Sequence, residues 1–176
     1  MTVRHEKKGN MTKTRLVLVE IIAVVLLTQI PIHAQELKKL SLDDASSIGL
    51  TIKTDTGVKT EGKASIKITT AWPTTVCLGE VIGVDLEEAK LVFKAKVKTE
   101  LEGDAFLEMW VKVGNGQFFS KGMNDPAKGK GDWKTIQTPF MFQKGQKPDK
   151  VTLNIVINGK GTVWVDDIVL SKEPLK

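Results

Sequence analysis

The chain has 176 residues and a formal charge of +5, from 26 lysine and arginine side chains and 21 aspartate and glutamate side chains. Both arginines and both histidines lie in residues 1–34, so residues 35–176 carry 21 basic and 19 acidic side chains, one cysteine, and no histidine, arginine or tyrosine. This composition excludes nucleophilic triads with an imidazole base and transition-metal sites built from histidine or several cysteines, and the near-neutral charge gives no sign of nucleic-acid binding.

Residues 1–34 have the pattern of a secretory signal peptide. A basic stretch ending at Arg15 precedes an apolar run, and Pro31 and the small residue Ala34 follow it. We predict cleavage after Ala34, and therefore a secreted, periplasmic or cell-envelope-associated protein. An uncleaved membrane anchor is the alternative, although Glu20 interrupts the run and a span needs about 20 apolar residues.

Residues 35–176 are enough for one domain with a single core, and their pattern predicts strands. Runs that alternate apolar and polar side chains are typical of half-buried strands. These predicted strands are 64–70, 91–98, 105–113, 151–157 and 162–171. The dipeptide Asn158-Gly159, followed by Lys160-Gly161, indicates a hairpin between the last two. Many short strands with little helix predict an all-β sandwich or jelly roll.

Two stretches leave alternatives open, and a third is predicted to be a loop. Residues 86–101 also have apolar spacing that suits a helix, although the lysine alternation from Lys94 favours a strand. Residues 37–44 suit a short helix or a loop. Residues 122–131, rich in glycine, are predicted to form the longest loop.

Four stretches resemble the jelly-roll carbohydrate-binding modules of the galactose-binding-like superfamily. Residues 61–68 are similar to the early strand of those modules, 91–99 to an inner strand, and Gly131-Asp132-Trp133 to the opening of a middle strand. Residues 161–170, GTVWVDDIVL, are similar to the closing strand and are the most specific match. The resemblance implies a galactose-binding-like jelly roll over residues 35–176 that binds carbohydrate without catalysis.

Tryptophan faces and planar amides or carboxylates are the groups that hold sugars in such modules. Trp110 and Glu108 alternate with the apolar row from Leu107 to Val113, so we expect them on the opposite face, where the resemblance implies a groove. Trp133 is a candidate for a loop-end site, and Asn154 and Gln137 are candidate amides on a groove floor. The alternative for each tryptophan is core packing, which we predict for Trp164.

The resemblance also implies a structural calcium ion where the first and last strands meet. Calcium takes hard oxygen ligands from carboxylates and carbonyls. The matching residues are Asp166, Glu61 and the Lys63 carbonyl. The alternative is that Asp166 caps backbone amides at the sheet edge.

The sequence therefore predicts a non-enzymatic domain whose partner is a polysaccharide or glycan. A glycosidase needs two carboxylates about 5 to 10 Å apart, and nothing in the sequence pairs Glu108 with Asp166. The alternative is a structural or adhesion protein of the cell envelope that binds a protein partner. No nucleic-acid contact is predicted, and membrane contact only if residues 1–34 are retained. The lysine row 94–98 is expected to be a solvated face, or to meet an acidic polysaccharide.

Overall fold

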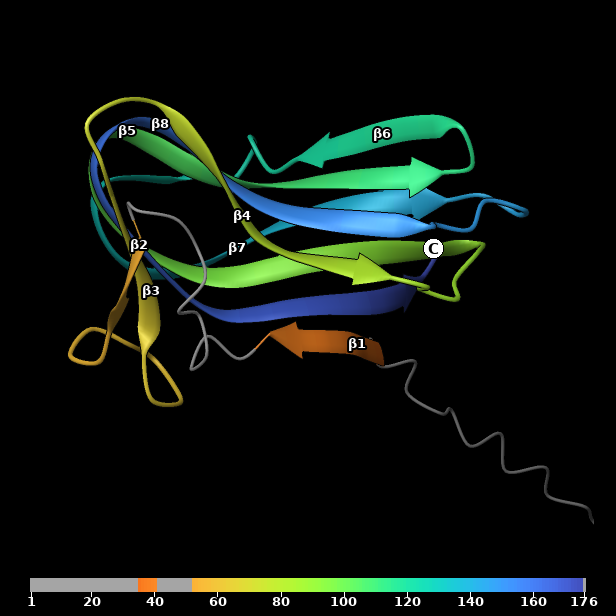
Figure 1. Cartoon of the computed structure of the whole chain (residues 1–176), viewed down its shortest axis with the longest axis horizontal. Helices are drawn as coiled ribbons and strands as arrows, with labels where there is room; N and C mark the ends of the chain where they lie inside the picture. The colour runs from red at the N-terminus through yellow and green to blue at the C-terminus, as the bar shows by residue number, and fades with distance from the viewer. Residues whose placement is uncertain (1–34, 41–51, 176) are drawn as a thin grey trace, which may run out of the picture. The chain divides into compact units, whose positions relative to one another are not determined.

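The computed structural model describes residues 35–40 and 52–175, so the predicted signal peptide and residues 41–44 lie outside the described residues. All secondary structure in the described part is β-strand (Figure 1). The strands are β1 (Gln35–Leu40), β2 (Ile52–Asp55), β3 (Ser65–Thr70), β4 (Thr74–Ile82), β5 (Ala89–Val113), β6 (Gly116–Lys121), β7 (Ala127–Phe142) and β8 (Lys150–Pro174). Within these ranges there is no helix suited to crossing a membrane.

The two longest strands, β5 and β8, run antiparallel along their whole length and contribute to both layers of a β-sandwich (Figure 1). In one layer, the second half of β5 pairs with β6 and the first half of β8 pairs with β4. In the other layer, the first half of β5 pairs with β7 and the second half of β8 pairs with β1 and β3. The all-β prediction is thus confirmed.

Glycines in the middle of β5 and β8 allow the paired strands to pass from one layer to the other. Gly103 lies opposite Gly159, with φ angles of 140° and 150°. A Cβ atom at Gly103 would lie 1.9 Å from the Asn158 carbonyl oxygen, and one at Gly159 would lie 2.0 Å from the Glu102 carbonyl oxygen. The two backbones therefore touch here, in a way that only glycine permits.

This bend corrects the prediction of a hairpin at 158–161. The strands predicted at 151–157 and 162–171 are one strand, β8, and those at 91–98 and 105–113 are one strand, β5. A turn and a close-packed bend both require glycine, so the local sequence did not distinguish them. The helical alternative for 86–101 is wrong, as is the loop predicted from 127, where β7 begins.

The hydrophobic core has the composition that the alternation predicted. Leu107, Met109 and Val111 are fully buried between the layers, together with Leu153 and Ile155 of β8. Because successive side chains of a strand point to opposite faces, this row places Glu108 and Trp110 on the outer face of their layer, as predicted.

Trp164 is buried, as predicted, but it lies on the outer face of its layer. Its neighbours Val163 and Val165 face the core, whereas Trp164 pairs across the sheet with Lys67 and Lys98. The pairing of β5 with β8 shifts register beyond this point. That irregularity reverses the alternation, so Trp164 does not share a face with the buried residues that follow it.

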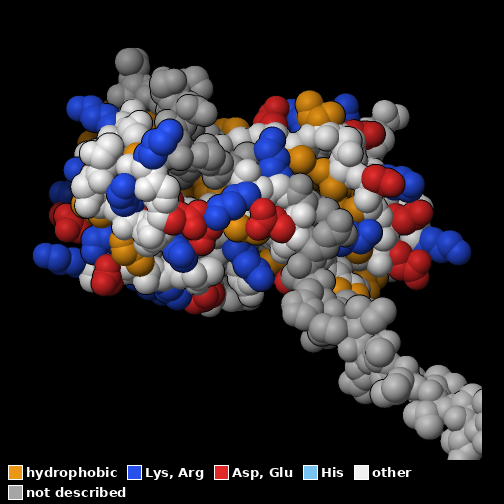
Figure 2. All heavy atoms as spheres, turned by 90° about the horizontal axis from the view of Figure 1, so that it is seen from below, with side chains coloured by type: hydrophobic (Ala, Val, Ile, Leu, Met, Phe, Trp, Pro, Cys, Tyr) orange, Lys and Arg blue, Asp and Glu red, His pale blue; other side chains and the backbone are white. Residues whose placement is uncertain are grey.

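The lysine row of β5 lies on the outer face of the second layer and is ion-paired. Lys90 and Lys94 pair with Glu173 at 2.6 and 3.4 Å. Lys96 pairs with Asp167, and Lys98 with Asp132, at 3.1 and 3.0 Å. Figure 2 shows lysine and acidic side chains interleaved in the same manner over one face of the molecule.

Candidate ligand-binding face

The outer face of the layer formed by β6, β5, β8 and β4 brings together three of the predicted ligand-binding residues. Residues paired across an antiparallel ladder point to the same face, and two successive rows of this ladder can be followed across all four strands. We call this surface the Trp110 face. Its members are Lys121, Glu108, Asn154 and Cys77 in one row, and Phe119, Trp110, Thr152 and Glu80 in the next.

Glu108 lies at the centre of the Trp110 face and is only 5% exposed. Its Oε1 accepts hydrogen bonds from the Trp110 indole nitrogen at 2.7 Å and from the Asn154 amide nitrogen at 3.2 Å. The Lys121 ammonium lies 3.2 Å from its Oε2. The carboxylate therefore joins side chains from three strands.

Two aromatic rings lie side by side on this face. The ring centroids of Trp110 and Phe119 are 5.2 Å apart, and their planes are inclined by 50°. Phe119 is 56% exposed, and the Lys121 ammonium lies 5.3 Å from its centroid. Trp110 itself is half-buried. An aromatic pair at the surface, flanked by hydrogen-bonding groups, can contact both the apolar faces and the hydroxyls of a sugar.

Glu80 forms the polar end of the second row. Its Oε1 accepts hydrogen bonds from the Lys150 ammonium at 2.9 Å and from the Thr152 hydroxyl at 3.1 Å. The hydrogen bond from Lys150 is the main cause that lowers the pKa of Glu80 below its ordinary value.

The structure places the other two ligand-binding candidates elsewhere. Gln137 pairs with Lys94 and therefore lies on the outer face of the opposite layer. Trp133 is half-buried in β7, and its backbone nitrogen donates to the Asp132 carboxylate at 2.9 Å. Neither joins the Trp110 face, because β7 pairs with the first half of β5 and not with the second.

Five members of the Trp110 face were not predicted as ligand-binding residues: Cys77, Phe119, Lys121, Thr152 and Glu80. The only local signal was the alternation of Phe119 and Lys121 in β6, which the adjacent apolar Phe118 obscures. Their assembly depends on which strands are neighbours, and that follows from the topology.

The predicted calcium ligand Asp166 has its oxygens occupied by hydrogen-bond donors. Its Oδ2 accepts from the Thr60 amide at 2.6 Å, the Thr60 hydroxyl at 2.9 Å and the Glu61 amide at 3.2 Å. Its Oδ1 accepts from the Asp167 amide at 2.8 Å. Asp166 thus caps backbone amides, the alternative raised by the sequence.

The two other predicted ligands also have cationic partners. The Lys39 ammonium lies 2.7 Å from the Glu61 carboxylate, and the Lys59 ammonium donates to the Lys63 carbonyl at 3.1 Å. The described ranges contain no cluster of three acidic, histidine or cysteine residues suited to a metal. These residues therefore do not fit a calcium ion in this arrangement.

The fold is similar to solved carbohydrate-binding modules. The tandem CBM22-1–CBM22-2 domain of Paenibacillus barcinonensis Xyn10C matches with a TM-score of 0.59 at 13% identity, over 81% of this chain and 47% of that chain. A xylan-binding domain of family 22 matches at 0.56 and 6%, over 81% and 97%. A family 16 module matches at 0.51 and 10%, over 69% and 86%. The chain has the fold of the carbohydrate-binding modules.

Such modules are non-catalytic, although some are joined to enzyme domains. One match is the CBM22-1–GH10 structure of Clostridium thermocellum Xyn10B, in which the module accompanies a xylanase. No protein-family model and no curated protein matches the sequence. At identities of 6% to 13%, the structural similarity shows the fold alone.

Proposed function

We propose that this protein binds a polysaccharide on the Trp110 face and does not act on it chemically. The observation that carries the proposal is the pair of half-buried Trp110 and exposed Phe119, set among amide, carboxylate and ammonium groups on an outer sheet face. The similarity to modules described as xylan-binding supports a glycan ligand. We also infer that residues 1–34 direct secretion. N-terminal sequencing of the mature protein would test cleavage after Ala34.

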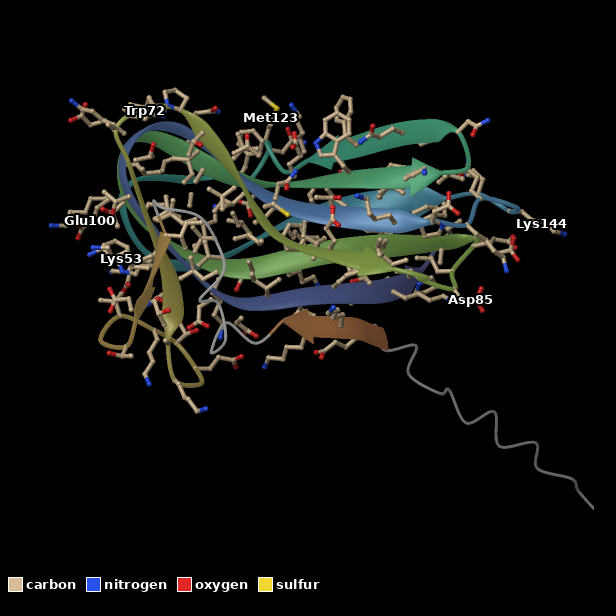
Figure 3. The ribbon with its side chains drawn as sticks, viewed as in Figure 1. Lys53, Trp72, Asp85, Glu100, Met123 and Lys144 are labelled. Carbon is tan, nitrogen blue, oxygen red and sulfur yellow. The ribbon has the colours of Figure 1, made fainter. Side chains whose placement is uncertain are left out.

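Binding can be tested with isothermal titration calorimetry against soluble xylan, mixed-linkage β-glucan, galactan and polygalacturonate. Trp110→Ala should weaken binding at least about fivefold, because truncating a stacking aromatic side chain costs about 1 kcal/mol or more. Trp72→Ala is the matched control. Trp72 is 68% exposed and lies at the end of the sandwich where β5 and β8 bend (Figure 3). Absence of binding to the whole panel, or equal binding by Trp110→Ala, would refute the proposal.

The single cysteine gives an independent test of the location. Cys77 is exposed and pairs with Asn154 across the ladder, so it lies on the Trp110 face. A bound polysaccharide should slow alkylation of its thiol. In the double variant Cys77→Ser/Lys53→Cys, the reporter thiol moves to exposed Lys53 on β2, where the same polysaccharide should not change the rate. If binding occurs and Cys77 stays equally reactive, the ligand lies elsewhere.

The predicted alternative of a cell-envelope protein partner stays open to experiment. A pull-down from envelope extract, with and without added polysaccharide, separates the two. Capture that the polysaccharide does not compete away would indicate a protein partner outside the Trp110 face.

A further inference from the structure

We propose that Glu108 is the positioning residue of the Trp110 face, and that it orients the ligand-contacting groups without contacting the ligand itself. The inference rests on the proposed function. It differs from the sequence-based expectation, in which Glu108 bonds sugar hydroxyls directly.

The Glu108 carboxylate has few hydrogen-bond acceptor positions left for a ligand. Both carboxylate oxygens already have partners: Trp110 and Asn154 donate to Oε1, and Lys121 lies beside Oε2. The residue is only 5% exposed. A carboxylate has about four acceptor positions, of which three are occupied, and burial leaves the fourth, on Oε2, little access to a sugar hydroxyl.

The Glu108 carboxylate also sets the orientation of the Trp110 and Asn154 side chains. An indole has one hydrogen-bond donor, and Trp110 uses it on Glu108, so the ring orientation is set and only the ring face remains for a ligand. The Asn154 amide nitrogen is held in the same way, so the orientation of its carboxamide group is set as well.

Glu108 also holds a side chain of the edge strand β6. Lys121 comes from β6, and its ammonium lies near both the Glu108 carboxylate and the Phe119 ring. Glu108 therefore fixes the cation that lies beside the second aromatic ring. Glu108 thus orients Trp110 and the Asn154 amide directly and holds the cation beside Phe119.

The identity of the acid matters because all three neighbours are nitrogen donors. A carboxylate offers only acceptors, whereas glutamine would offer one acceptor oxygen and one NH₂ group. In Glu108→Gln, the three donors compete for a single oxygen. The Lys121 ammonium, as the charged donor, takes it, so the Trp110 indole and the Asn154 amide face the NH₂ group. Removing the ammonium as well, in Glu108→Gln/Lys121→Met, removes this conflict.

The test combines binding, stability and spectroscopy on the full exported chain. Glu108→Gln should weaken binding to soluble xylan and the panel above by about tenfold, the loss expected for a disrupted charged hydrogen bond. The affinity of the double variant Glu108→Gln/Lys121→Met should be within about threefold of the affinity of Lys121→Met alone. The effects of the two substitutions would then be non-additive. The matched control, Glu102→Gln, changes an exposed glutamate that pairs with Lys160 at the bend, and should bind as the original protein does.

A spectroscopic measurement separates positioning from a direct contact. Glu108→Gln should change the near-ultraviolet circular dichroism of the free protein, and this change should be absent when Trp110 is already Phe. Unchanged binding by Glu108→Gln, or equal loss in the single and double variants, overturns the proposal. Lost binding with an unchanged spectrum also overturns it, because Glu108 would then contact the ligand.

The two proposals fail in different ways. If no polysaccharide binds, the proposed function fails, and the spectrum of the free Glu108→Gln variant still decides whether Glu108 orients Trp110.

Discussion

At the scale of single residues, the hydrogen bond between the buried Trp164 indole and the Asp55 carboxylate makes the stability of the fold depend on pH. The Asp55 carboxylate accepts a hydrogen bond from the Trp164 indole at 2.9 Å and others from the amides of Val58 and Gly57. The bond from Trp164 is the main cause that holds the pKa of Asp55 below its ordinary value of 3.8. These contacts link the bend after β2 to the last strand, β8.

The lowered pKa of Asp55 sets the sign of the pH dependence of stability. A carboxyl with a lowered pKa contributes stability that is complete above its unfolded pKa and is lost as the pH falls through its folded pKa. We therefore expect Asp55→Asn to flatten the decline of the melting temperature below about pH 4. Trp164→Phe, which removes the main donor, should act in the same direction. Thermal melts from pH 6 to pH 2 measure this, and parallel profiles would contradict it.

The arrangement at Asp166 leads to a second prediction. Asp166→Asn replaces an acceptor for several backbone donors and should destabilise the fold by about 1 to 3 kcal/mol in urea unfolding. Because Lys39 already pairs with the Glu61 carboxylate and Lys59 donates to the Lys63 carbonyl, Ca²⁺ and EDTA should leave the unfolding midpoint unchanged. A midpoint that rises with Ca²⁺ concentration would instead show that the ion binds the folded protein.

The residues that the sequence could predict are those decided within one strand. The alternation of 105–113 placed Trp110 and Glu108 opposite the core row, and this was right. Trp133 and Gln137 were predicted as ligand-binding residues from the pattern of their own strand. Their separation from Trp110 depends on which half of β5 pairs with β7. For Trp164, the irregular pairing beyond it reverses the alternation, and no local spacing reveals such an irregularity.

At the scale of elements, the bend in β5 and β8 is the feature that makes a sandwich from two long strands. Backbone groups approach so closely at Gly103 and Gly159 that side chains have no room. The sequence identified glycines at 158–161 correctly and assigned them to a turn. What it lacked was the pairing of Gly103 with Gly159, which joins residues far apart in the chain.

A substitution pair tests this packing. Gly159→Ala should destabilise the protein by at least about 3 kcal/mol, since the backbone must move to admit the methyl group. Gly145→Ala is the matched control, because Gly145 also has a positive φ, 80°, but has no atom within 4 Å of an added Cβ. It should cost only about 1 to 2 kcal/mol, from the left-handed backbone. Similar losses in urea unfolding for both variants would contradict the argument.

At the scale of the whole molecule, the two layers share their central strands and one core. We expect a single cooperative unfolding transition for residues 35–176, because neither layer can lose β5 or β8 without disrupting the other. Tryptophan fluorescence and far-ultraviolet circular dichroism should give the same midpoint in guanidinium chloride. Two separated transitions would indicate that the layers are independent.

The pairing of β5 with β8 also has a kinetic consequence. Lys112 and Lys150 are the paired residues nearest in sequence, and Ala89 and Pro174 are the farthest apart. Closing the shorter loop costs less conformational entropy, so the pairing should begin at the Lys112 end and proceed toward the bend. In refolding experiments, Leu153→Ala should therefore give a higher φ-value than Leu170→Ala, and the reverse order would refute this pathway. The layer that carries the Trp110 face is then the first to form, and the second layer folds against a surface that is already in place.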